Sequence, residues 1–128
     1  MTEELFERDA NSLLNLITTG LQAVNRIRDE KRRNSCERAL KNAEKGIKEL
    51  KTSINKLSDN LRDVFRIIRQ GQENPNLANN SDFQEKLQKA KQQKEKLLLE
   101  KDKLYHEFNE ISNFVLSTYN DLLPLLIV

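Results

Sequence analysis

The residue types best suited to nucleophilic catalysis occur once each in this chain, as Cys36 and His106. A cysteine nucleophile needs a base within hydrogen-bond reach. If the helices that carry them run antiparallel, Cys36 lies level with about Leu116 and His106 level with about Gly46, on the order of 15 Å apart. We therefore predict that the two do not act together. Cys36 is expected to be a small core residue and His106 a solvent-exposed one.

Metal and cofactor sites are not predicted either. One Cys and one His are too few for a Cys/His zinc site, and the chain has no Gly-rich phosphate loop, HExxH motif or EF-hand. A di-iron bundle would need Glu-x-x-His pairs, but Lys103 stands three positions before His106. Carboxylate pairs such as Glu107/Glu110 are expected to be solvated. The sequence thus predicts no catalytic residue, no metal and no cofactor, and we expect that the protein is not an enzyme.

The composition is typical of long, solvated helices. Of 128 residues, 37% are hydrophobic and 33% charged, with 3 Gly and 2 Pro, which excludes collagen, Gly/Pro-rich disorder and a many-turned β-sandwich. The 22 basic and 20 acidic residues give a net charge of +2, without the basic excess of a dedicated nucleic-acid binder. The start, Met-Thr-Glu-Glu, lacks the basic region of a signal peptide, and no run of about 18 apolar residues occurs. We therefore expect a cytoplasmic protein.

A heptad repeat in the middle of the chain predicts a helix over residues 35–70. Its apolar positions alternate in steps of four and three. They are Cys36, Leu40, Ala43, Ile47, Leu50, Ile54, Leu57, Leu61, Val64 and Ile68. Beside this seam, the g positions Ala39, Gly46 and Ser53 are small and uncharged. The pattern favours a bundle helix that touches two neighbours over one half of a parallel zipper.

The first segment predicts another helix, over residues 3–31, with a similar stripe. Its seam is Phe6, Ala10, Leu13, Ile17, Gly20, Val24 and Ile27. Gly20 is expected where another helix approaches closely, because glycine otherwise costs about 1 kcal/mol in a helix. The two heptads differ in phase across residues 28–35, where Asn34 and Glu37 resemble a capping box. This favours a turn between the helices over one continuous helix with a phase slip.

A loop over residues 71–80 and a third helix over residues 82–123 follow. The loop contains Gly71, Pro75 and four Asn, and a capping box is expected at Ser81–Gln84. The seam of the third helix includes Lys94 and Lys101, so these lysines either snorkel along a thin part of the bundle or lie on a stretch that projects beyond it. Pro124 is expected to end the helix and to begin an apolar tail over residues 124–128.

Together these elements predict an all-α fold, an antiparallel up-down-up bundle of three long helices with coiled-coil-like heptad packing. Residues 1–128 are expected to form a single domain. The heptads resemble coiled-coil segments in general, which does not identify a function. Because the third helix outreaches the others, we expect a homo-oligomer or a subunit of a larger complex.

We expect a non-catalytic protein–protein interaction module, such as an adaptor or scaffold, that acts through helix-on-helix packing. The expected partner contacts are Leu97, Leu104, Phe108, Phe114, Leu125, Leu126, Ile127 and Val128. One alternative is a nucleic-acid-associated subunit that uses the arginine-rich tip between the first two helices. The residues of this tip that could contact anions are Arg28, Lys31, Arg32, Arg33 and Arg38. A second alternative is a membrane-active bundle that uses the apolar tail.

Overall fold

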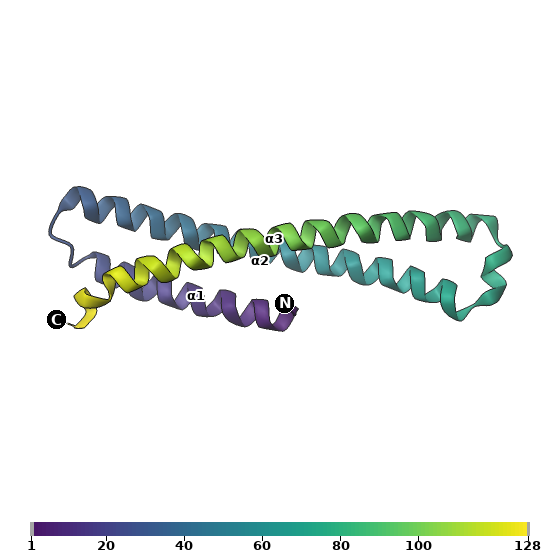
Figure 1. Cartoon of the computed structure of the whole chain (residues 1–128), viewed down its shortest axis with the longest axis horizontal. Coiled ribbons are helices and arrows are strands. Elements are labelled where there is room, and N and C mark those ends of the chain that lie inside the picture. The colour runs from purple at the N-terminus through teal and green to yellow at the C-terminus, as the bar shows by residue number, and fades with distance from the viewer. Residues whose placement is uncertain (1, 128) are drawn as a thin grey trace. The chain divides into compact units, whose positions relative to one another are not determined.

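The computed structural model describes residues 2–127 and has three α-helices and one 3₁₀ helix in that range (Figure 1). Helix α1 spans Glu3–Val24, α2 spans Glu30–Glu73, η1 spans Pro75–Asn79 and α3 spans Ser81–Ile127. The helices pack against one another, so the predicted all-α bundle is confirmed. The chain divides into two compact units. Unit 1 comprises Met1–Lys51 and His106–Val128, and unit 2 comprises Thr52–Tyr105.

Unit 1 is formed by α1, the first part of α2 and the last part of α3. The heptad positions predicted for these helices supply its core. The largest fully buried side chains there are Phe6, Ile17, Val24, Leu40, Ile47, Phe108 and Val115. The rings of Phe6 on α1 and Phe108 on α3 meet edge to face, with centroids 4.8 Å apart and planes at 72°. Aromatic pairs prefer this arrangement.

Two glycines of unit 1 lie where helices approach closely. A Cβ atom on Gly20 would lie 3.3 Å from Leu40 Cδ1 and 3.6 Å from Leu122 Cδ1. A Cβ atom on Gly46 would lie 3.1 Å from Ile111 Cδ1. The close approach predicted for Gly20 is therefore confirmed, and Gly46, a g position of α2, allows a similar approach to α3.

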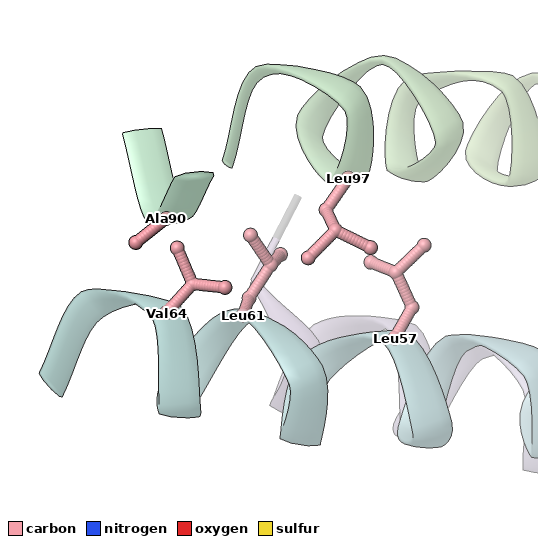
Figure 2. Close-up of a cluster of buried hydrophobic side chains, with 5 residues drawn as sticks. All are labelled: Leu57, Leu61, Val64, Ala90 and Leu97. Atoms are coloured by element: carbon pink, nitrogen blue, oxygen red, sulfur yellow. The ribbon is translucent and has the colours of Figure 1, made fainter. Parts of the chain in front are cut away.

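Unit 2 is a hairpin of α2 and α3 with η1 at its turn. Leu57, Leu61 and Val64 point from α2 toward α3, where Ala90 and Leu97 meet them (Figure 2). The Lys94 ammonium lies 5.6 Å from the centre of the Phe65 ring, and Lys94 itself is half-buried. This placement corresponds to snorkelling, one of the two arrangements that the sequence left open for this lysine, with the charge resting on an aromatic face.

The turn between α1 and α2 lies earlier than predicted. Helix α1 ends at Val24 rather than near residue 31, and α2 begins at Glu30 rather than near residue 35. The reason is the choice of cap: Asp29 Oδ1 accepts a hydrogen bond from the Lys31 amide at 3.1 Å, so Asp29 starts the helix and Asn34 lies inside it. The turn absorbs the phase difference between the two heptads, and α1 and α2 are separate helices.

The second connection is also shorter than the predicted loop. Helix α2 continues past Gly71 to Glu73, because Gly71 packs against α3, where an added Cβ atom would lie 3.2 Å from Leu87. Residues 75–79 form η1. Asn80 caps α3, with its Oδ1 accepting from the Phe83 amide at 3.2 Å, so the helix begins one residue before the predicted start.

Pro124 does not end α3, contrary to the prediction. The helix continues to Ile127. Proline removes one amide donor and strains the preceding turn, but only three residues of α3 follow Pro124. The following turn is held by Arg26 of the α1–α2 turn, whose Nη1 donates to the Leu125 carbonyl at 2.5 Å. Residues 124–127 are thus the last turn of α3 rather than a separate tail.

Candidate functional site

Cys36 and His106, the two potential catalytic side chains, have different surroundings in unit 1. The predicted core position of Cys36 is wrong: the side chain is half-buried and lines a surface pocket with Thr118 and Asp121 of α3. Burial raises the pKa of the Cys36 thiol, Arg32 partly offsets this rise, and Asp121 adds to it; a raised pKa lowers the reactive thiolate fraction at neutral pH. His106 is exposed, as predicted, with its Nε2 atom 3.2 Å from Glu110 Oε1. This arrangement does not activate the thiol.

Metal-ligating side chains do not gather within residues 2–127: no three His, Cys, Asp or Glu residues there could hold an ion together. The Glu107/Glu110 pair lies on the exposed surface of α3, as expected for solvated carboxylates.

Three of the expected partner contacts pack within the chain itself. Leu97 belongs to the core of unit 2 (Figure 2), and Leu104 is half-buried against the same cluster. Phe108 is 2% exposed and contacts Phe6. The heptad spacing that singled these residues out is a signal for burial, and the chain satisfies it with its own helices.

The remaining expected contacts lie near the end of α3. Phe114 is 44% exposed and Ile127 is 77% exposed, whereas Leu125 and Leu126 are half-buried. Val128 lies outside the described residues. Phe114 is the one aromatic ring among these side chains. It is presented to solvent from within α3 and lines a hollow in the surface.

The arginine-rich tip is a mixed surface rather than a uniformly basic one. Arg33 is half-buried and donates from Nη1 to the Ile27 carbonyl at 3.1 Å, which commits it to the α1–α2 turn. Arg28 and Arg32 are exposed beside Asp29 in a pocket that Asp121 also lines. Lys31 and Arg38 are exposed on α2, the latter two turns into the helix. The five residues therefore do not form one continuous basic face.

A groove in unit 1 runs between α2 and α3. It consists of two adjoining hollows that share Ala39 and Phe114. Helix α2 contributes Ser35, Cys36, Ala39, Asn42 and Ala43, and α3 contributes Glu110, Ile111, Phe114 and Thr118. We call this surface the α2–α3 groove. Its floor is low because the α2 side chains are small, and the Phe114 ring forms part of its wall.

The α2–α3 groove lies on the flank of α2 opposite to α1. On the α1 side, Lys51 Nζ is 3.1 Å from Glu7 Oε1 and 2.8 Å from Asn11 Oδ1. Lys51 occupies an e position of the heptad and Ala39 a g position, which are on opposite sides of the buried seam. Helix α1 therefore covers one flank of the α2–α3 pair in unit 1, and the groove marks the other.

Charged residues mark the two ends of the groove. Lys31, Arg32 and Asp29 line one end, with a net positive charge, and Glu110 lines the other.

The sequence signalled this surface only indirectly. The sequence shows small residues at the g positions of α2. The same residues would also be expected if another helix of the chain packed against these positions. The phase of Phe114, outside the α3 seam, was the more specific clue.

None of the helices within residues 2–127 is both long enough and apolar enough to cross a lipid bilayer. Comparison of the chain with known protein families, curated proteins and solved structures finds no match.

Proposed function

We propose that this chain is a non-catalytic protein–protein interaction module that binds a helix in the α2–α3 groove. The observation that carries the proposal is Phe114, an aromatic ring 44% exposed beside a floor of small side chains. Large exposed apolar side chains that border a hollow are typical of binding surfaces, whereas isolated ones are common on any protein.

The shape of the groove favours a helix as the bound element. Ser35 and Ala39 lie four residues apart on α2, and Ala43, which is almost buried, follows one turn later, so small side chains line this side of the helix. Helices pack by placing the side-chain ridge of one into such a groove of another. An amphipathic helix seated there would cover Phe114 and gain roughly 1 kcal/mol from that ring alone, since full burial of Phe is worth about 1.5–3 kcal/mol.

The arginine-rich tip and the end of α3 are weaker candidates for the binding surface than the α2–α3 groove. Arg33 and Arg26 donate hydrogen bonds to carbonyls of the chain, which occupies donors that a phosphate would need. The carboxylates that line the pocket with Arg32 reduce the local positive charge. Leu125 and Leu126 of the last α3 turn are half-buried, and Ile127 is 77% exposed but lines none of the hollows described above. The α2–α3 groove is the better candidate for an interaction surface.

Site-specific photo-cross-linking tests the proposal. A benzophenone amino acid replaces Phe114, and the matched control carries it at Phe65, which has a similar exposure of 41% but lies in unit 2. In extracts of the source cells, we expect cross-links from position 114 that map to one helical segment and are absent from position 65.

A blocking substitution makes the result specific. Ala39→Glu places a carboxylate on the groove floor and should remove those cross-links, while far-UV circular dichroism verifies that the helices remain. Equal labelling from the two positions, or labelling that Ala39→Glu does not reduce, would refute the proposal.

A further inference from the structure

We propose that the pocket between the α1–α2 turn and the end of α3 binds a small monocarboxylate with an apolar body. We call this pocket the turn pocket. Its lining residues fall within the ranges 26–36 and 118–125, all in unit 1, and its volume is about 610 Å³. Sites for small molecules typically have volumes of about 300–1,000 Å³ and combine an apolar lining with a few converging polar groups. The turn pocket meets this description in its size and in its lining.

Hydrogen bonds within unit 1 hold the walls of the turn pocket in place. Arg26 donates to the Leu125 carbonyl, which ties the α1–α2 turn to the last turn of α3. Arg33 donates to the Ile27 carbonyl, which fixes the course of the turn itself. A pocket whose walls are already ordered loses less conformational entropy when a ligand enters. These bonds therefore favour binding in the turn pocket.

The apolar part of the lining suits the body of the ligand. Leu122 is buried, Ile27 and Leu125 are half-buried, and Pro124 also lines the pocket. Cys36 extends this surface, because burial raises the pKa of its thiol and the thiol is therefore neutral at pH 7. An aliphatic chain placed against these side chains would shield apolar surface from water.

The arginines of the turn pocket suit a single carboxylate. The guanidinium groups of Arg28 and Arg32 form no ion pair or hydrogen bond with other residues in the range 2–127, and the planar fork of a guanidinium matches the geometry of a carboxylate. With Arg26, Asp29 and Asp121, the charged side chains of the lining have a net charge of +1. One carboxylate neutralises this charge, whereas a dianionic group would leave excess negative charge beside the two aspartates.

Titration of the isotope-labelled full chain with octanoate, followed by ¹H–¹⁵N correlation spectra, tests the proposal. We expect saturable shifts that are largest at amides of Ile27, Leu122 and Leu125 and absent from unit 2. The dissociation constant should be about 1–10 mM, the range for a ligand of about ten non-hydrogen atoms. Octylammonium carries the same apolar chain with the opposite charge, and it should bind at least about tenfold more weakly because of the net charge of the pocket.

Two charge reversals three residues apart test which cation binds the carboxylate. Arg28→Glu should weaken octanoate binding about tenfold or more, the loss expected for a hydrogen bond between charged groups. The matched control is Lys31→Glu, because Lys31 is exposed on the same tip and lines the α2–α3 groove but not the turn pocket. This control should change binding by about twofold or less. Far-UV circular dichroism verifies that both variants keep their helices.

Three results would overturn the inference. They are the absence of saturable shifts up to about 50 mM octanoate, several times the expected constant, equal binding of octanoate and octylammonium, and equal effects of Arg28→Glu and Lys31→Glu. The first two need only the wild-type chain, so they decide the matter even if a variant does not fold. The proposed function is tested separately, because Phe114 lines the α2–α3 groove and not the turn pocket.

Discussion

Replacing Phe6 with alanine tests whether α1 packs on the α2–α3 pair as the structure of unit 1 describes. Phe6 has no exposed surface, and its ring meets Phe108 at 4.8 Å. The substitution removes the ring from the centre of unit 1 without changing charge or backbone. We expect a large loss of stability that depends on Phe108.

The size of the loss follows from the burial of Phe6. Removing a buried Phe side chain costs roughly 3–5 kcal/mol, of which about 0.5–1.5 kcal/mol belongs to the edge-to-face pair. Alanine returns about 0.5 kcal/mol because it is the better helix former. Phe6 also lies near the start of α1, where the chain can relax into the space. We therefore expect a decrease of about 3 kcal/mol in the free energy of unfolding, a large share of the 5–15 kcal/mol typical of a small protein.

Urea titration followed by far-UV circular dichroism measures this loss, since the chain has no Trp and only 2 Tyr for fluorescence. A double-mutant cycle with Phe108→Ala should give a coupling of about 0.5–1.5 kcal/mol. Leu5→Ala is the control, because Leu5 is the adjacent residue and is 41% exposed, and should change stability by about 0.5 kcal/mol or less. A loss for Phe6→Ala below about 1 kcal/mol, with no coupling to Phe108, would refute the packing of α1.

Two further predictions concern unit 2 and the free thiol. Leu57→Ala should cost roughly 2–3 kcal/mol in urea titration, the low end of the range for a buried Leu, because a two-helix hairpin can close around the gap; no loss would show that this part of α2 faces water. The pKa of Cys36 is raised in the folded chain, so iodoacetamide should label it with a pH midpoint above the ordinary value of about 8.5. The same shift means that the stability contributed by the neutral thiol is present below about pH 8.5 and is lost as the pH rises toward the folded pKa; Cys36→Ser should remove that loss, and a labelling midpoint at or below 8.5 would contradict the burial of the thiol.

The helical cores could be predicted from sequence because burial leaves a periodic mark. Heptad positions such as Leu40, Ile47 and Phe108 are buried as the spacing indicated, and Gly20 lies at a close helix contact. These features depend on several residues in phase, so a single exception does not obscure them.

Element boundaries were less predictable because each depends on one or two hydrogen bonds. Asp29 and Asn34 are both good N-caps by residue type, but in the structure it is Asp29 that accepts from the Lys31 amide, in a turn where Arg33 donates to the Ile27 carbonyl. Pro124 is a helix breaker in a helix interior, but near the helix end its cost is small, and Arg26 stabilises the turn that follows it. Such choices are set by contacts distant in the sequence.

The candidate site was the least predictable feature. Apolar residues of α3 that fill the core, such as Leu97, and one that borders a groove, Phe114, are alike in type and differ only in phase. Whether a neighbouring helix covers a given phase is a tertiary property. The small g positions of α2 could therefore indicate closeness to α3 or an open groove, and Ala39 lines the groove while Gly46 lies against Ile111.

The discontinuity of unit 1 has a consequence for the order in which the chain acquires structure during synthesis. Unit 2 is one continuous segment whose two helices are joined by a short turn, so its contacts are local and close rapidly. Unit 1 needs α1 and the last part of α3 together, and the Arg26–Leu125 hydrogen bond joins residues 99 positions apart. While a ribosome is still translating α3, the apolar face of α1 therefore has no complete partner, although the hairpin of unit 2 can already form. Nascent chains of this protein should expose Phe6 and Ile17 until the last part of α3 has left the ribosome, so α1 needs protection from aggregation during that interval, for example by chaperones.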